Sequence, residues 1–391
     1  MLSRSTARRA AAWRVAVLAL GVAGAMLATA CTSPPPPGPS TTTISTTPTS
    51  SPTGHGLPRI PADAPTLESK TVSFTWVGDM NFGTRGSYPP GGIATIFDGV
   101  RNQLKSDVPI ANLETVLGTA PLTRCKPATP PAKNYCYLFE APPSAAYVLR
   151  DVGFRVVNIA NNHSLDAGTV GMSQTKAALT AAGVAWVGEP GQITYLTANG
   201  VHVAVLGFGP YPTSADARDI PGAQAMVKQA KTKAQVVIVV MHMGAEGTAQ
   251  AHLRPGHEYF QGYDRGDTMG FAHSVIDAGA DLVVGSGPHV LRGMQWYKGR
   301  LIAYSLGDFS GYHTFSTAGT MGISGILHVT LDPGGGFVKA SVTPLRLVNP
   351  GTPTVDHAGS AWALMNSLSR ADFGATGAII SSNGKIRPPT T

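Results

Sequence analysis

Five apolar segments of this chain each lead into residues that bind metals or transfer protons. The segments TVSFTWV, VPIAN, RVVNIA, QVVIVVM and ADLVVG are followed, within a few residues, by Asp79, Glu114, Asn162 with His163, His242 and His289. Such β-branched runs predict strands, and functional sites of open α/β sheets form at the carboxyl ends of strands. Each ending alone is more typical of a turn or a surface histidine. Five together predict one site, and oxygen and imidazole donors without thiolates favour Mn, Fe or Zn, as one or two ions.

The elements that would hold these residues alternate along the chain. From about Val72, β-branched apolar runs alternate with segments of helical period, such as 171–182 and 268–278, which indicates an α/β fold. A hydrophobic fraction of 43% in 391 residues is enough for a sizeable core. Residues 351–391 are rich in Gly, Ser and Thr, and we expect them to form a C-terminal extension with one helix at 360–369.

The first thirty residues have the layout of an export signal. Four arginines precede the apolar run 15–30, which is short for a membrane-spanning helix. The small residues before Cys31 resemble a bacterial lipobox, in which the cysteine is lipidated; ordinary cleavage after Ala30, with Cys31 incidental, is the alternative. Residues 31–68 are rich in Pro, Ser and Thr and predict a disordered tether. We expect an extracytoplasmic protein that is lipid-anchored to the cell membrane.

Charge and cysteine content agree with export. Loss of residues 1–30 removes four arginines and no acidic residue, so the formal net charge falls from +7 to +3. This mild excess is compatible with an anionic polymer as partner, and the lack of a basic stripe with interleaved aromatics argues against nucleic acid. In an oxidising compartment, Cys125 and Cys136 are expected to form a disulfide around a Pro-rich loop; a zinc site is the weaker alternative.

The motifs resemble a known family. Gly-Asp, Asn-Leu-Glu, Asn-Asn-His-x-x-Asp-x-Gly, His-x-Gly-x-Glu, Gly-x-x-Pro-His and Ser-Leu-Gly-Asp-Phe occur in this order, from about Val72 to about Phe309. The set resembles the CapA family of poly-γ-glutamate capsule synthesis, whose domain is similar to calcineurin-like metallophosphoesterases. The resemblance implies a domain at 69–350 with a four-layer α-β-β-α sandwich and two mixed sheets.

The resemblance also implies roles for individual residues. Asp79, Asn162, His242 and His289 would be metal ligands, and Glu114 would bridge two metals.

His163 would be the proton donor or transition-state stabiliser, and Asp166 would orient it or brace its loop. Glu246 would lie behind His242, because metal-binding imidazoles usually need a carboxylate or carbonyl partner.

Two positions depart from the phosphoesterase pattern. Asn81 stands where a histidine is usual, and Gly287 replaces the first imidazole of the last motif, so the second metal position is weakened. Asp308 would face the site or begin a turn. Arg292 would meet an anionic substrate or be an ordinary surface arginine.

Three functions are compatible with these patterns. The first is a metal-dependent hydrolase that acts on a phosphoester or on a polyglutamate-type polymer. The second is a non-catalytic component that binds an anionic polyglutamate-type chain, or passes it to a membrane-bound synthase, with a degenerate metal site. The third is a structural envelope lipoprotein.

Overall fold

The computed structural model describes residues 70–125 and 136–389 of the chain. The predicted signal peptide, the lipidation site Cys31 and the tether 31–68 lie outside the described residues. Among the helices of the described part, none combines the length and the apolar character needed to cross a bilayer.

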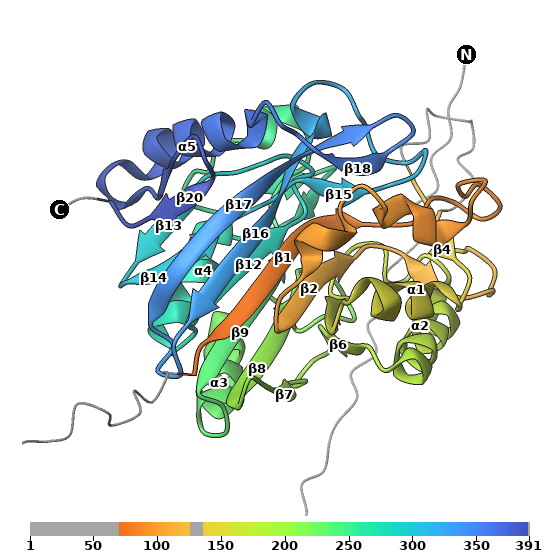
Figure 1. The fold of residues 1–391 in the computed structure, drawn as a ribbon. Helices are drawn as coiled ribbons and strands as arrows, with labels where there is room; N and C mark the ends of the chain where they lie inside the picture. Colours follow the sequence, from red (N-terminus) through yellow and green to blue (C-terminus); the bar gives the residue numbers. More distant parts are fainter. Residues whose placement is uncertain (1–69, 126–135, 390–391) are drawn as a thin grey trace, which may run out of the picture. The chain divides into compact units, whose positions relative to one another are not determined.

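The larger sheet has ten strands and is mixed. Its strands are β1 (Val72–Met80), β2 (Val108–Leu113), β5 (Val156–Asn158), β6 (Ala185–Val187), β15 (Asp308–Ser310), β16 (Ile323–Leu331), β17 (Phe337–Val348), β18 (Thr352–Val355), β19 (Ile379–Ile380) and β20 (Lys385–Arg387). The strand order is β19-β20-β17-β16-β1-β2-β5-β6, and β15 and β18 pair with β1 and β17. Figure 1 shows β1 between β16 on one side and β2 on the other. β1 is parallel to β2 and antiparallel to β16.

The smaller sheet has six strands and is also mixed. It contains β7 (Thr194–Ala198), β8 (Val201–Phe208), β9 (Val236–His242), β12 (Leu282–Ser286), β13 (Met294–Tyr297) and β14 (Arg300–Ala303). The order is β13-β14-β12-β9-β8-β7, with the central strands parallel. Two short ribbons complete the strands: β3 (Val116–Leu117) with β4 (Glu140–Ala141), and β10 (Tyr259–Phe260) with β11 (Tyr263–Asp264).

The α-helices are α1 (Ala145–Val152), α2 (Gly168–Ala182), α3 (Ile220–Lys231), α4 (Thr268–Asp277) and α5 (Ser360–Phe373). Short 3-10 helices lie at η1 (Ile93–Phe97), η2 (Arg101–Leu104), η3 (Thr248–Gln250), η4 (Gly319–Gly322) and η5 (Gly374–Thr376). α3 and α4 begin after aspartates, Asp219 and Asp267, whose carboxylates accept a hydrogen bond from a first-turn N–H. The helices predicted at 171–182, 268–278 and 360–369 are α2, α4 and α5, with ends that differ by one to four residues.

Three apolar cores separate four layers. The alternation of side chains along each strand sends one set of residues into a core between the sheets, for example Trp76 of β1, Val203 of β8 and Val240 of β9. A second core lies between the larger sheet and the helices α1 and α2. A third lies between the smaller sheet and the helices α3 and α4. The predicted four-layer sandwich with two mixed sheets is confirmed.

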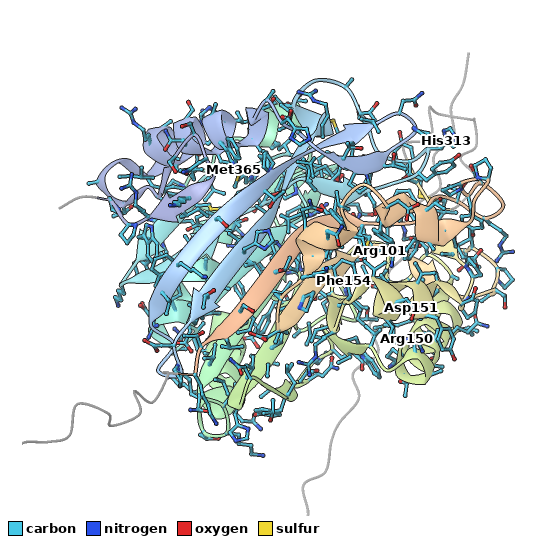
Figure 2. The ribbon with its side chains drawn as sticks, in the orientation of Figure 1. Arg101, Arg150, Asp151, Phe154, His313 and Met365 are labelled. Carbon is cyan, nitrogen blue, oxygen red and sulfur yellow. A yellow bond between two sulfur atoms is a disulfide. The ribbon has the colours of Figure 1, made fainter. Side chains whose placement is uncertain are left out.

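The segment predicted as a C-terminal extension is built into the same domain. Residues 352–387 supply β18, β19, β20 and α5, and β20 pairs with β17. Met365 of α5 is buried in the core between the sheets, whereas Arg150 and Asp151 at the end of α1 pair with each other at the surface (Figure 2).

Candidate metal centre

The carboxyl ends of five strands from both sheets meet at one place. Asp79 is the second-last residue of β1 and His242 is the last residue of β9. The segments after β2, β5 and β12 supply Glu114, His163 and His289. All five residues are buried, with at most 9% of their surface exposed. Parallel strands that end together bring residues remote in sequence into contact, so the convergence predicted from the sequence is found.

Glu114 lies at the centre of three imidazoles. Its Oε1 atom is 3.7 Å from Nε2 of His242, 3.8 Å from Nε2 of His163 and 3.9 Å from Nε2 of His289. Neither carboxylate oxygen has a hydrogen-bond partner in the described part of the chain, although the residue is fully buried. Burial, and then the charge of Asp79, raise the pKa of Glu114 well above its ordinary value. An unpaired buried carboxylate is costly, and a cation bound between it and the imidazole nitrogens would remove that cost.

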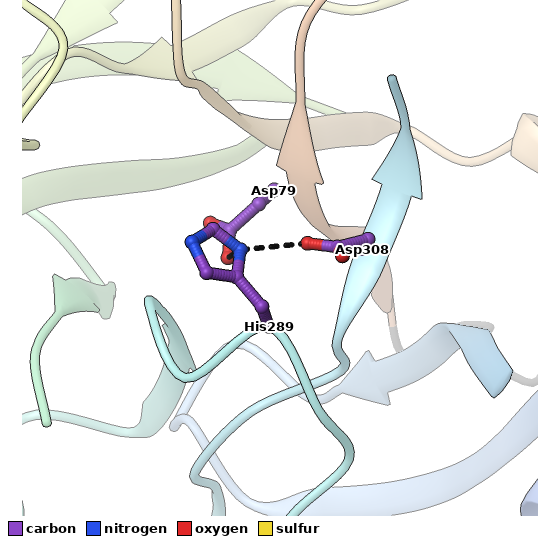
Figure 3. A group of neighbouring side chains, drawn as sticks. All are labelled: Asp79, His289 and Asp308. Atoms are coloured by element: carbon purple, nitrogen blue, oxygen red, sulfur yellow. Dashed lines mark hydrogen bonds and ion pairs between the residues drawn. The ribbon is translucent and has the colours of Figure 1, made fainter. Parts of the chain in front are cut away.

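Asp79, His289 and Asp308 form a second group of potential ligands beside it (Figure 3). Asp79 and Asp308 face each other in the register of the parallel strands β1 and β15. Nδ1 of His289 is 2.7 Å from Oδ1 of Asp308 and 3.2 Å from Oδ2 of Asp79. One ligand atom from each residue falls within a 4.8 Å group, which is compact enough for one cation. Of the two expectations for Asp308, the structure supports the one in which it faces the site.

The charges of this group depend on each other. Burial disfavours the charged form of His289, but Asp308, Glu114 and Asp79 outweigh it and raise the pKa of this imidazole well above its usual range. Burial raises the pKa of Asp308 to about 7. Burial also opposes the ionisation of Asp79, yet His242 and His289 hold its pKa well below the ordinary value. Without a cation, the imidazolium of His289 therefore balances the carboxylates. A bound metal would take over this charge and displace the proton.

A chain of buried amides orients Asp79 and His242. Nδ2 of Asn112 is 2.8 Å from Oδ1 of Asp79 and 3.0 Å from Nδ1 of His242. Asn112 in turn accepts a hydrogen bond from Asn158 at 2.8 Å. Oδ1 of Asn162 is 2.9 Å from Nε2 of His242, so this amide also reaches the cluster. Sequence reasoning missed the roles of Asn112 and Asn158; the available signal was an amide inside each of two apolar strands, where an unpaired polar group is costly.

His163 is held by a network outside the metal ligands. Its Nδ1 is 2.8 Å from Oδ2 of Asp166, and its ring stacks on Phe139 with centroids 4.1 Å apart. The Asp166 carboxylate also accepts hydrogen bonds from Arg124 Nε at 2.5 Å and from the Phe139 backbone N–H at 2.6 Å. Burial lowers the pKa of His163, against the charge of Asp166. The predicted orienting contact between Asp166 and His163 is present.

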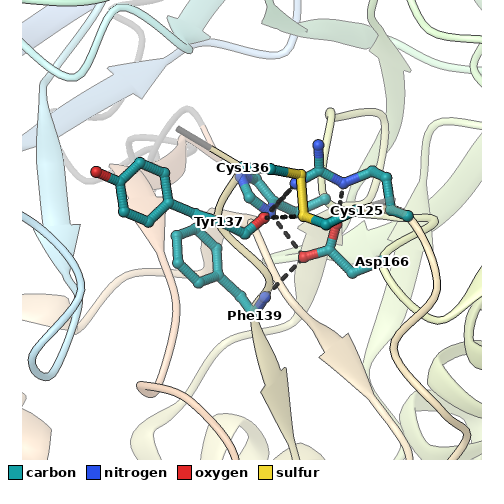
Figure 4. Close-up of a disulfide and its surroundings, with 7 residues drawn as sticks. Cys125, Cys136, Tyr137, Phe139 and Asp166 are labelled. Carbon is teal, nitrogen blue, oxygen red and sulfur yellow. Dashed lines mark hydrogen bonds and ion pairs between the residues drawn. A yellow bond between two sulfur atoms is a disulfide. The ribbon is translucent and has the colours of Figure 1, made fainter. Parts of the chain in front are cut away.

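A disulfide borders this network (Figure 4). Cys125 and Cys136 are joined, as expected for an exported chain, with Cα atoms 5.8 Å apart. Arg124 precedes the first cysteine and also donates to the carbonyl of Tyr137, which follows the second. The crosslink therefore ties together the two segments that hold Asp166.

Two predicted roles need correction. Glu246 does not lie behind His242: its Oε2 is 3.8 Å from Nε2 of His289, and its Oε1 accepts a hydrogen bond from Arg265 at 2.7 Å. Arg292 is neither at the surface nor free for a substrate. It is fully buried, and its Nη1 and Nη2 donate to both carboxylate oxygens of Glu258 at 2.9 and 2.5 Å.

Asn81, the first departure from the phosphoesterase pattern, is held by neighbouring loops. Its Oδ1 accepts hydrogen bonds from the backbone N–H of Gly83 at 3.0 Å and from Thr314 Oγ1 at 2.8 Å. The amide oxygen is therefore engaged with neighbouring loops and does not replace the usual histidine.

Gly287 explains the missing imidazole. Its φ is +113°, and a Cβ atom there would lie 2.9 Å from the carbonyl oxygen of Met243. Its N–H donates to Oδ2 of Asp79 at 3.0 Å. The backbone thus occupies the space of a side chain, so a histidine does not fit here without displacement of β9. The cluster consequently has three imidazoles, those of His163, His242 and His289, around Glu114.

The donor set suits a divalent transition metal. Carboxylates, imidazoles and one amide are all present, and the unpaired oxygens of Glu114 are available. Mn, Fe and Zn accept such a mixed set.

Comparisons with known proteins agree with the motifs. Residues 73–312 match the family described as bacterial capsule synthesis protein PGA_cap. The chain is 33% identical over 179 residues to the PGA biosynthesis protein CapA of Bacillus subtilis (strain 168), covering 41% of this chain and 44% of that protein. It is 34% identical over 181 residues to the capsule biosynthesis protein CapA of Bacillus anthracis, covering 41% of each. The alignments thus span less than half the length of these two relatives.

A longer alignment and two solved structures add to the comparison. A probable polyglutamine synthesis accessory protein of Mycobacterium tuberculosis (strain ATCC 25618 / H37Rv) is 27% identical over 303 residues, with 68% of this chain and 72% of that protein covered. A hypothetical protein from Thermus thermophilus aligns over 70% of this chain and 99% of its own, with 17% identity and a TM-score of 0.43. A 5'-nucleotidase precursor from the same organism aligns over 71% and 54%, with 15% identity and a TM-score of 0.38.

Proposed function

The chain belongs to the bacterial capsule synthesis protein family, and from this premise we propose that it is a metal-dependent hydrolase that processes an anionic polymer of the polyglutamate type. The observation that carries the proposal is the fully buried Glu114 carboxylate. Its two oxygens lack hydrogen-bond partners in the described chain, and its Oε1 lies 3.7–3.9 Å from three Nε2 atoms. A purely structural cluster would leave this carboxylate at a high energetic cost.

The proposed metal ligands are the side chains at the ends of the five strands. They are Asp79, Glu114, Asn162, His242 and His289, to which the structure adds Asp308. A bound divalent cation supplies Lewis acidity for attack on an amide or a phosphoester.

The residues around His163 would move the proton of this reaction. The Asp166 carboxylate accepts a hydrogen bond from Nδ1 of His163. The neutral imidazole therefore carries its hydrogen on Nδ1, and its Nε2 atom faces the cluster. Nε2 can take up a proton there and return it to the leaving group. The contacts of Asp166 with Arg124 and Phe139 keep the carboxylate in place.

A non-catalytic role in binding an anionic polymer, or in passing it to a membrane-bound synthase, is the second candidate. The observation that favours it is Gly287, whose N–H occupies Oδ2 of Asp79 where an additional imidazole would be expected. Export and a lipid anchor at Cys31 are part of either proposal, because residues 1–30 have the layout of an export signal that ends in small residues before this cysteine.

The test is to measure metal content and turnover on the full chain. We expect bound Mn, Fe or Zn by elemental analysis, and metal-dependent cleavage of poly-γ-glutamate or of a generic phosphodiester. Asp79→Ala and His242→Ala should lose both, whereas His202→Ala, at an exposed position on β8, should lose neither. Polymer binding without turnover, unchanged in the Asp79 and His242 variants, would favour the non-catalytic role.

A further inference from the structure

A buried arginine beside the metal centre has an open hydrogen-bonding edge. Arg265 follows β11 and is 4% exposed. Its Nη1 donates to Oε1 of Glu246 at 2.7 Å. Its Nε and Nη2 atoms are buried and have no hydrogen-bond partner among the described residues. Buried N–H donors of a charged group destabilise a protein when they lack an acceptor. An acceptor bound at this edge would remove that cost.

The open edge has the shape that recognises an oxyanion. Nε–H and one Nη2–H of a guanidinium point in the same direction and fit the two oxygens of a carboxylate or a phosphate. The same edge is filled elsewhere in this chain, because Nε and Nη2 of Arg85 both donate to the carboxylate of Glu140. Arg265 thus differs from Arg85 in lacking the acidic partner on that edge.

The guanidinium group of Arg265 lies next to the residues of the candidate metal centre. Glu246, which holds Nη1, has its other oxygen 3.8 Å from Nε2 of His289. The Cζ atom of Arg265 is 5.4 Å from the ring centroid of Tyr211, and this ring is 5.7 Å from that of His242.

Tyr211 offers a further donor in the same place. Its hydroxyl is buried and has no hydrogen-bond partner in the described part of the chain. A phenolic hydroxyl carries its proton at neutral pH and can donate it in a hydrogen bond. Arg265 and Tyr211 are therefore neighbours, and each has buried donors without a partner among the described residues.

We propose that Arg265 and Tyr211 form a subsite that binds an oxyanion of the substrate beside the metal centre. For a polyglutamate-type polymer the oxyanion is the carboxylate of a glutamyl unit, and this identification rests on the proposed function. A phosphate group can likewise accept two parallel hydrogen bonds from a guanidinium. The Cζ atom of Arg265 also lies 5.8 Å from the ring centroid of Phe260 in β10, so the β10–β11 ribbon borders the guanidinium.

Binding can be measured apart from turnover. Isothermal titration of the metal-free full chain with oligo-γ-glutamate, glutamate and inorganic phosphate would identify the preferred oxyanion. Arg265→Gln should weaken binding by about tenfold or more, as expected for a lost hydrogen bond to a charged group. Tyr211→Phe should weaken it by a smaller factor. Arg265→Lys should recover only part of the affinity, because a lysine keeps the charge and loses the fork.

The matched control is Arg218→Gln, which removes an arginine paired with Asp216 through the same Nε and Nη2 atoms at an exposed position. This variant should bind like the wild type. If Arg265→Gln does not fold, Arg265→Lys and Tyr211→Phe decide the question by themselves. Unchanged affinity in the variants, or no binding of any of the three anions by the wild type, would overturn the subsite and leave a site for ordered water only. Failure of the proposed function would instead appear as anion binding without metal uptake or turnover.

Discussion

Nδ1 of His163 lies 2.8 Å from Oδ2 of Asp166, and the other oxygen of that carboxylate is held by Arg124. His242 and His289 have their Nδ1 atoms 3.3 and 3.2 Å from oxygens of Asp79, which belongs to the metal centre. Of the three imidazoles, His163 is the one whose Nδ1 lies beside a carboxylate outside the proposed ligand set. This difference matches the proposed division between a residue that would move a proton and residues that would hold a cation.

The first prediction concerns Asp166. Asp166→Asn keeps the size of the side chain but removes its negative charge. The carboxylate that accepts the Nδ1 hydrogen of His163, and so fixes its tautomer, is then lost. We expect turnover to fall by about 10²–10⁴-fold, the usual contribution of general acid–base catalysis, while metal content stays unchanged. Steady-state kinetics with elemental analysis on the same sample would check this. Equal loss of metal and activity would contradict the assignment.

The second prediction concerns the unpaired carboxylate at the centre of the cluster. Added Mn or Zn should raise the melting temperature of the wild type, because an ion that binds the folded state stabilises it. Glu114→Gln should abolish this rise, because the variant would no longer hold the ion. Glu189→Gln, which changes a partly exposed glutamate paired with Lys176, is the control and should keep the full rise. A metal-induced shift of equal size in both variants would exclude Glu114 as a ligand.

The third prediction concerns pH and the buried pair of Arg292 with Glu258. Burial alone would raise the pKa of Glu258, but Arg292 and further hydrogen bonds lower it below the ordinary 4.5. Because the pKa of Glu258 is lower in the folded state, the pair stabilises the protein at pH values above 4.5. This stability is lost as the pH falls through the lowered pKa. Glu258→Gln should cost about 3–5 kcal/mol at neutral pH, since it leaves a buried charge unpaired.

Denaturant unfolding between pH 3 and 8 would measure this effect. The Glu258 variant should show a flatter loss of stability in acid than the wild type. Glu189→Gln, from the more exposed pair, should cost no more than about 1 kcal/mol. Similar costs for the two variants would show that burial of Arg292 does not set the energy of its pair.

The fourth prediction concerns the disulfide. Replacement of Cys125 and Cys136 by serine should lower the free energy of unfolding by about 2–4 kcal/mol, because the unfolded chain gains freedom. The wild type should lose a similar amount in reductant, and the double variant should be insensitive to it. Non-reducing denaturant titrations would show either result, and a reductant-sensitive double variant would refute the pairing.

The fifth prediction concerns Gly287. Gly287→Ala should destabilise the protein by about 1–3 kcal/mol through its positive φ, and by more through the clash with Met243. Gly299→Ala is the matched control, since Gly299 also has a positive φ, of 75°, but no atom within 4 Å of an added Cβ. The excess cost at position 287, measured by thermal unfolding, isolates the close approach to β9. Equal costs at both positions would contradict it.

The sequence by itself determined the α/β class, the strand ends and most of the donor set. Each apolar run must be buried, and a polar residue directly after it must lie at the end of a strand, so Asp79 and His242 were identifiable without coordinates. The disulfide followed from the number of cysteines and the expected compartment. These are local rules, which depend on residues near one another in the chain.

Only the tertiary structure decided which side chains share a partner. Arg292 carries no sequence signal that separates a surface arginine from one fully buried against Glu258, because the packing of a distant loop decides it. Gly287 reads as a lost histidine, yet the approach of β9 leaves no room for a side chain. Arg265 lies in no motif, and its position beside Glu246 depends on the path of the β10–β11 ribbon. Contacts between segments far apart in sequence are set by the whole fold, and so they escape rules that read neighbouring residues.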